Sequence, residues 1–71
     1  MTKTEILEKL RDILLIREEV DSDFPVKIDS LASLLLIQFY DEHFNFRLSS
    51  ETLKRVQKIG DLIDLVKDKL E

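Results

Sequence analysis

The stretch from Ile28 to Phe44, IDSLASLLLIQFYDEHF, holds the strongest apolar pattern in the chain and decides the predicted fold. Asp29 and Ser30 are both good helix N-caps, and the residues after them are strongly helical. One face of this helix carries Ser33, Leu36, Ile37, Tyr40 and Phe44. A neighbouring face carries Leu31, Leu34, Leu35 and Gln38, and continues to Asp41 and Glu42. A helix with a single core contact does not need two apolar stripes. We therefore expect either a deeply buried helix or a second stripe that meets a partner.

The segment before this helix is predicted to be another helix followed by a long loop. Thr2 and Glu5 fit a capping box, and the apolar positions that follow at helical spacing are Ile6, Leu7, Leu10, Ile13 and Leu14. The helical pattern fades after Ile16 or Arg17. Residues 18–29 contain turn formers, including Pro25. We expect Phe24, Val26 and Ile28 to pin this loop onto the bundle without forming a strand, because a strand here would have nothing to pair with.

Two further helices are predicted after residue 44. Ser49 or Ser50 caps a short helix, and a last helix runs from about Lys58 to Leu70. Its apolar face carries Ile59, Leu62, Ile63, Val66 and Leu70. The expected fold is all-α: a four-helix bundle with three longer helices and one short third helix, forming a single domain over residues 1–71.

Composition excludes several classes of function. A chain of 71 residues without cysteine has neither a disulfide framework nor a cysteine metal site. Its net charge of −4 repels phosphate backbones, so nucleic-acid binding is not expected. The apolar run at residues 34–37 is too short to span a bilayer, and no segment resembles a signal peptide. We expect a cytoplasmic monomer.

No group of side chains in the sequence has the spacing of a catalytic or metal site. His43 is the only histidine, and it is expected to be an exposed helix residue. The last helix carries an acidic stripe, expected to be a solvated face, of Asp61, Asp64 and Asp68. Nothing resembles a nucleophile–base pair, a phosphate-binding glycine loop or an EF-hand. We therefore expect no catalytic residues, no metal and no enzyme activity.

The order of the predicted elements resembles the acyl carrier protein family and its peptidyl and aryl carrier relatives. The signature is Asp29-Ser30-Leu31 at the start of the second of four helices. The resemblance runs from residue 28 to about residue 66 and needs no gap between residues 30 and 63. Phe44 stands where the family has the aromatic residue that closes its second helix, and Leu48 matches the apolar residue before the short third helix.

This resemblance implies a four-helix bundle of the acyl-carrier-protein type that carries a covalent 4′-phosphopantetheine arm, derived from coenzyme A, on Ser30. A phosphopantetheinyl transferase would attach the arm, Asp29 would orient the motif for the transferase, and Leu31 would make an apolar contact beside the arm. The thiol of the arm would hold acyl intermediates as thioesters. The implied pathways are fatty-acid, polyketide or specialised lipid and secondary-metabolite synthesis, with acyl-loading and acyl-processing enzymes as partners.

The second helix of the family also docks partner enzymes. On this chain the corresponding positions are Leu34, Leu35, Gln38, Asp41 and Glu42. Ala32 and Leu35 fill places that are usually acidic in the family, and Lys27 stands where a glycine is usual. Docking is therefore expected to be more apolar and less electrostatic.

Three alternatives stay open at this point. The cargo is aminoacyl or peptidyl instead of acyl, or the chain is an unmodified interaction module that kept the carrier fold. In the third alternative, an unrelated amphipathic bundle binds a partner helix through Leu31, Leu34 and Leu35. Ser30 by itself also fits an ordinary helix cap.

Overall fold

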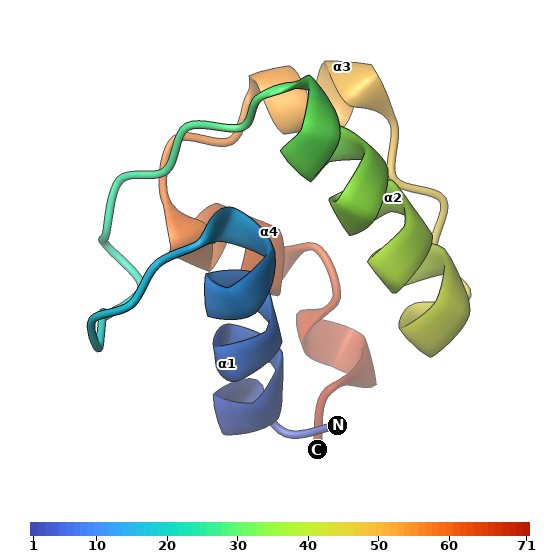
Figure 1. Ribbon diagram of the computed structural model, residues 1–71. Coiled ribbons are helices and arrows are strands. Elements are labelled where there is room, and N and C mark those ends of the chain that lie inside the picture. The colour runs from blue at the N-terminus through green and yellow to red at the C-terminus, as the bar shows by residue number, and fades with distance from the viewer.

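The computed structural model describes residues 1–71 and is an all-α chain of four helices without a strand, as predicted. The helices and a final 3-10 turn are α1 (Lys3–Leu14), α2 (Ser30–Phe44), α3 (Ser50–Lys54), α4 (Ile59–Asp64) and η1 (Lys67–Lys69). α1 packs against both α2 and α4, and α3 lies beside the start of α2 (Figure 1). The two chain ends lie next to each other, and the amide of Glu71 donates to the carbonyl of Met1 (3.0 Å).

Local capping signals set the starts of the first three helices. The amide of Glu5 donates to Thr2 Oγ1 (3.2 Å) and the amide of Thr2 donates to Glu5 Oε1 (3.1 Å), so the predicted capping box is confirmed. The hydrogen bonds from Thr2 lower the pKa of Glu5. Ser49 caps α3 by accepting from the amide of Thr52 (3.1 Å). These caps need only residues within one turn, so they can be recognised in the sequence.

The end of α1 is a left-handed residue that is not glycine. Leu15 has φ 59° and ψ 36°, and its amide donates to Asp12 O (3.3 Å) while the amide of Ile16 donates to Arg11 O (2.8 Å). A left-handed conformation costs a residue with a Cβ about 1–2 kcal/mol. The Leu15 side chain is 81% exposed, so packing within the chain does not offset this cost.

The core is built around one face of α2. Leu36, Tyr40 and Phe44 are buried as predicted, but Ala32 and Phe39 are buried as well, while Ser33 and Ile37 are only half-buried. The buried face is thus rotated from the predicted one. α1 lies along one side of α2, and Phe39 stacks edge-on against both Tyr40 and Phe44.

A buried hydrogen bond joins the middle of α2 to α4. Tyr40 is fully buried, and its hydroxyl donates to the carbonyl of Leu62, which lies 22 residues further along the chain. In a continuous helix that carbonyl would accept from the amide of Val66. Here the amide of Val66 donates to Ile63 O instead (3.1 Å). Burial raises the pKa of Tyr40, so the side chain is neutral and acts as the donor.

The predicted last helix, from about Lys58 to Leu70, is wrong in length. α4 has 6 residues and ends at Asp64, and the chain then tightens into η1, whose three residues are all exposed. The Leu62 carbonyl accepts from Tyr40 and not from the Val66 amide, and the side chains of residues 67–69 are exposed, so no buried contact supports a longer helix. The chain therefore has two longer helices, not three.

Asp61 is more than part of a solvated face. Its Oδ2 accepts from the amides of Gln57 (2.9 Å) and Lys58 (3.2 Å) at the start of α4. The hydrogen bond from Gln57 is the main cause that lowers the pKa of Asp61.

The loop between α1 and α2 is pinned as predicted, but it also pairs through its backbone. Phe24, Val26 and Ile28 are half-buried and pack against the core. The amide of Val26 donates to Gln57 O (3.1 Å), and the amide of Ile59 donates to Phe24 O (2.9 Å). The expectation that this segment has nothing to pair with is therefore wrong, because Pro25 forms an isolated antiparallel bridge with Lys58, just before α4.

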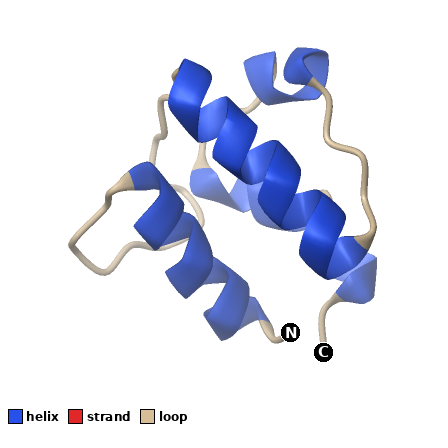
Figure 2. Cartoon of the chain, turned by 45° about the vertical axis from the view of Figure 1, so that its right-hand side comes forward, coloured by secondary structure: helices blue, strands red, loops and turns tan.

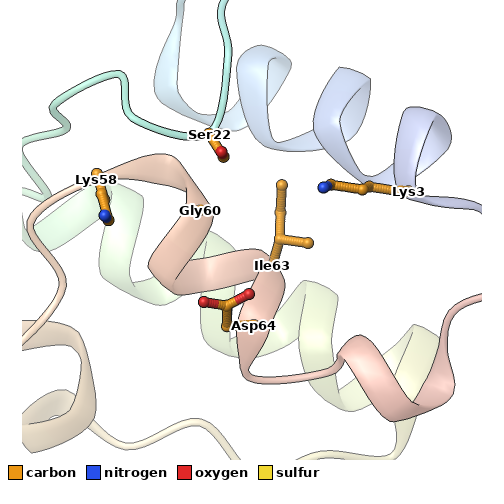
Figure 3. A pocket seen from close by; sticks show the side chains of 6 residues that line it. All are labelled: Lys3, Ser22, Lys58, Gly60, Ile63 and Asp64. Atoms are coloured by element: carbon orange, nitrogen blue, oxygen red, sulfur yellow. The ribbon is translucent and has the colours of Figure 1, made fainter.

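Gly60 allows the same loop to approach α4 closely. Its amide donates to Ser22 O (2.8 Å), and a Cβ at this position would lie 2.7 Å from that oxygen. Figure 3 shows the small hollow next to this contact, of about 110 Å³, lined by Lys3, Ser22, Lys58, Gly60, Ile63 and Asp64. Glycine is thus required at position 60 because the backbone of Ser22 leaves no room for a Cβ. This contact matters more for the choice of residue than the low helix propensity of glycine.

Gly60→Ala is expected to lower the free energy of unfolding by about 1–3 kcal/mol, since the added methyl group meets a backbone oxygen that can move only with the loop. Urea denaturation followed by circular dichroism measures this change. Asp64→Ala, an exposed position on the same helix, is the control and should stay within about 0.5 kcal/mol of wild type. A Gly60→Ala variant more stable than wild type would contradict the close contact.

Tyr40→Phe is expected to cost about 1–3 kcal/mol, because it leaves the buried Leu62 carbonyl without its donor while keeping the ring in place. The unfolding midpoint in urea reports the loss. Equal midpoints for the variant and wild type would show that the hydrogen bond does not tie α2 to α4.

Candidate functional site

Asp29, not Ser30, is the N-cap of α2. Asp29 has extended backbone angles (φ −85°, ψ −177°), and its Oδ1 accepts from the amide of Ala32 (2.8 Å). Ser30 is the first residue of the helix, and its side chain is exposed. The interpretation of Ser30 as an ordinary helix cap is therefore wrong. The Ser30 hydroxyl stands at the positive end of the helix dipole without a capping role.

A polar hollow lies on one side of Ser30, where α3 meets the start of α2. Its volume is about 180 Å³, and it is lined by Ile28, Asp29, Ser30, Ser33, Ser50, Leu53 and Lys54. The polar lining therefore consists of three serines, one lysine and one aspartate. Lys54 is exposed, and its positive charge adds to that of the helix end. The helix start and Lys54 favour an anion in this hollow, whereas the carboxylate of Asp29, which also lines it, opposes one.

An apolar hollow lies between the end of α1 and the start of α2. Its volume is about 170 Å³, and its apolar lining consists of Ile13, Leu14, Leu15, Leu31, Ala32 and Leu35. Asp12, Lys27 and Asp29 complete it. Asp29 thus lines both hollows, and the start of α2 separates them. Figure 2 shows α1 and α2 side by side around this region.

The second stripe of α2 is exposed. Leu31 is 66% exposed, Leu34 65% and Leu35 40%. The sequence left two possibilities for this helix, deep burial or a second stripe that meets a partner. These exposed fractions exclude deep burial. Leu34, Gln38 and Asp41 line another hollow together with Ile37, Arg47 and Leu48. Gln38 Nε2 also donates to Glu42 Oε1 (3.1 Å). All five predicted partner-binding residues are therefore accessible along the outer face of α2. Ala32, in contrast, is buried.

Two residues of this region were not predicted from the sequence. Leu15 joins the apolar hollow only because α1 ends in a left-handed turn, and Lys54 joins the polar hollow only because α3 folds back beside α2. No local pattern marks either residue, since both depend on where distant helices pack.

Three further features concern the histidine, possible metal ligands and the length of the helices. His43 is exposed as predicted and stacks on Phe39, with ring centroids 4.6 Å apart. The structure gathers no set of three or more histidine or acidic side chains suited to a metal ion. None of the helices has the length and apolar character needed to cross a membrane.

No family model matches the chain, and comparisons with curated proteins and with solved structures find no match either.

The capping roles make a direct prediction. Asp29→Ala should lower the free energy of unfolding by about 1 kcal/mol, because the amide of Ala32 loses its acceptor. Ser30→Ala should stay within about 0.5 kcal/mol of wild type, because the serine side chain supports no helix bond. Urea denaturation of both variants tests the pair. A larger loss for Ser30→Ala than for Asp29→Ala would reverse the assignment of the cap.

Proposed function

We propose that the protein is an acyl carrier protein of the four-helix type that carries its cargo on a 4′-phosphopantetheine arm attached to Ser30. One observation carries the proposal: Asp29 makes the capping hydrogen bond of α2, so the exposed Ser30 hydroxyl is left without a structural task at a positively polarised helix end. A hydroxyl on a rigid element that another enzyme can reach is what such a modification requires.

The residues around Ser30 fit the group. In the attachment reaction, Ser30 Oγ would attack the pantetheine-bearing phosphorus of coenzyme A, the pyrophosphate P–O bond would break, and adenosine bisphosphate would leave. The hydroxyl proton would pass to a base of the transferase. The phosphodiester formed on Ser30 would lie next to free backbone amides at the start of α2. Lys54, Ser33 and Ser50 line the hollow beside it, and so does Asp29, whose negative charge opposes that of the phosphate.

The chain itself would hold and present the arm without catalysing a reaction. The distal thiol of the arm would carry acyl groups as thioesters for a fatty-acid, polyketide or specialised lipid pathway. Asp29 stiffens the helix start that the transferase meets. Loading and processing enzymes would dock on the exposed outer face of α2, where Leu34 and Leu35 supply apolar contact and Asp41 and Glu42 supply charge.

One observation favours a second candidate, an unmodified interaction module. Leu31, Leu34 and Leu35 expose a continuous apolar stripe on a short chain, and an exposed stripe of this kind marks an interaction site. Such a module would keep the docking face and would have no use for the Ser30 hydroxyl. An aminoacyl or peptidyl cargo stays the alternative within the carrier proposal.

The test is modification in vitro. The protein is incubated with a promiscuous phosphopantetheinyl transferase, magnesium and coenzyme A, and its intact mass is measured. We expect the wild type to gain one phosphopantetheine group and Ser30→Ala to gain none, because only Ser30 presents a free hydroxyl at the helix start.

Ser33→Ala is the matched control, since Ser33 lines the same hollow but is half-buried one turn later. It should be modified like the wild type. A folded wild-type protein that gains no mass would overturn the carrier proposal and leave the interaction module as the better one.

A further inference from the structure

The outer face of α2 exposes three leucines, Leu31, Leu34 and Leu35, that nothing within the chain covers. We infer that this face pairs with a second copy of the same chain, in a weak dimer whose two α2 helices lie side by side and antiparallel. The dimer replaces the monomer expected from the sequence. It goes beyond the proposed function and does not depend on it, because the contact needs no arm on Ser30.

The spacing of the exposed residues suits packing between two helices. Leu31, Leu34, Leu35 and Gln38, the seam, stand at i, i+3, i+4 and i+7 along α2, and all four are exposed. Residues at this spacing form the hole that receives one side chain of the facing helix in a coiled coil. In an antiparallel pair centred between residues 34 and 35, Leu34 of one copy meets Leu35 of the other, and Leu31 meets Gln38. Leucine thus meets leucine at the centre.

The two ends of this face differ in charge. At the start of α2, Lys27 lines the apolar hollow and Lys54 the polar one, with the single carboxylate of Asp29 between them. At the other end Asp41 and Glu42 are exposed. The helix dipole adds positive charge at the start and negative charge at the end. An antiparallel partner therefore brings the acidic end of one copy to the basic end of the other.

The register of the leucines brings two of these charges to the same level. Lys27 and Glu42 are equally far in sequence from the centre of the seam, and both are exposed. The ion pairs within the chain lie elsewhere, so neither residue has an oppositely charged partner. Arg47 lines a hollow with Asp41 but makes no ion pair with it. In the antiparallel dimer, Lys27 of each copy lies opposite Glu42 of the other.

A second copy explains this pattern better than an unrelated partner helix. A two-fold axis uses the same patch on both copies, so the patch must be complementary to itself. The outer face of α2 meets this condition, because it is apolar in the middle, basic near the start and acidic near the end. A parallel, in-register pair would place Lys27 against Lys27 and Glu42 against Glu42, and like charges across an interface oppose association.

The contact is small, so the dimer is expected to be weak. Interfaces below about 1,200 Å² belong to transient complexes, and a dissociation constant on the order of 0.1 mM corresponds to such a contact. The dimer covers the face on which loading and processing enzymes would dock. A second copy and such an enzyme would therefore exclude each other.

Analytical ultracentrifugation of the full, unmodified chain tests the dimer. We expect monomer at about 10 μM and largely dimer at about 1 mM, concentrations that bracket the expected constant. Methyl NMR spectra across the same range locate the contact. The methyl signals of Leu31, Leu34 and Leu35 should shift with concentration, while those of the buried Leu10 and Leu53 stay unchanged.

Leu34→Gln removes one apolar side chain from the seam. It should raise the dissociation constant about tenfold, the effect of losing about 1.4 kcal/mol of contact. Leu15→Gln is the matched control, since it makes the same change on a leucine that is 81% exposed but stands at the end of α1, outside the seam. It should leave the constant within about twofold of wild type, as surface substitutions outside a contact have small effects.

A charge exchange tests the antiparallel arrangement. Lys27→Glu and Glu42→Lys should each raise the dissociation constant roughly fivefold, because each puts like charges opposite one another twice per dimer. The double variant should return to within about twofold of wild type, because the pairs re-form with their signs exchanged. Circular dichroism checks that each variant is folded.

A folded wild-type chain that stays monomeric at 1 mM would overturn the dimer and leave the outer face of α2 to another partner. Equal weakening by Leu15→Gln and Leu34→Gln would overturn the seam, and a double variant that is not restored would overturn the antiparallel arrangement. None of these results bears on the modification of Ser30, which the mass measurement tests separately.

Discussion

The hydrogen bond from Tyr40 to the Leu62 carbonyl is the contact on which the rest of the fold depends. It is fully buried, and it joins the longest helix to the C-terminal part of the chain. Because the phenol takes the place of the Val66 amide, α4 ends early and the chain can turn toward its N-terminus. Tyr40 thus links the buried face of α2 to the residue range in which α4 ends.

The orientation of α2 divides it into two faces with different tasks. Leu36, Tyr40 and Phe44 pack into the core, and this leaves Leu31, Leu34 and Leu35 outside. A chain of this size buries only a limited share of its surface. The leucines on the outer face form an exposed apolar area that does not contribute to the core. Binding of a partner or a ligand therefore explains these leucines better than a role in stability.

The start of α2 brings the proposed functions together. Asp29 satisfies an amide of the helix end, Ser30 is free, and two hollows of opposite character flank the pair. The polar hollow depends on the position of α3 and the apolar one on the left-handed end of α1. A carrier with an arm on Ser30 would place the phosphate of the arm beside the polar hollow. An unmodified module would use only the outer leucines.

The sequence by itself determined the all-α class, the starts of α1, α2 and α3, and Ser30 as the candidate residue. Each depends on contacts within about one helical turn, such as the bonds between Thr2 and Glu5 or from the Ala32 amide to Asp29. Only the tertiary structure decided which face of α2 is buried, where α4 ends, and that Gly60 meets Ser22. It alone placed Leu15 and Lys54 on opposite sides of Ser30. These features join residues far apart in the chain, and helical periodicity contains no information about which distant segment will pack against a given face.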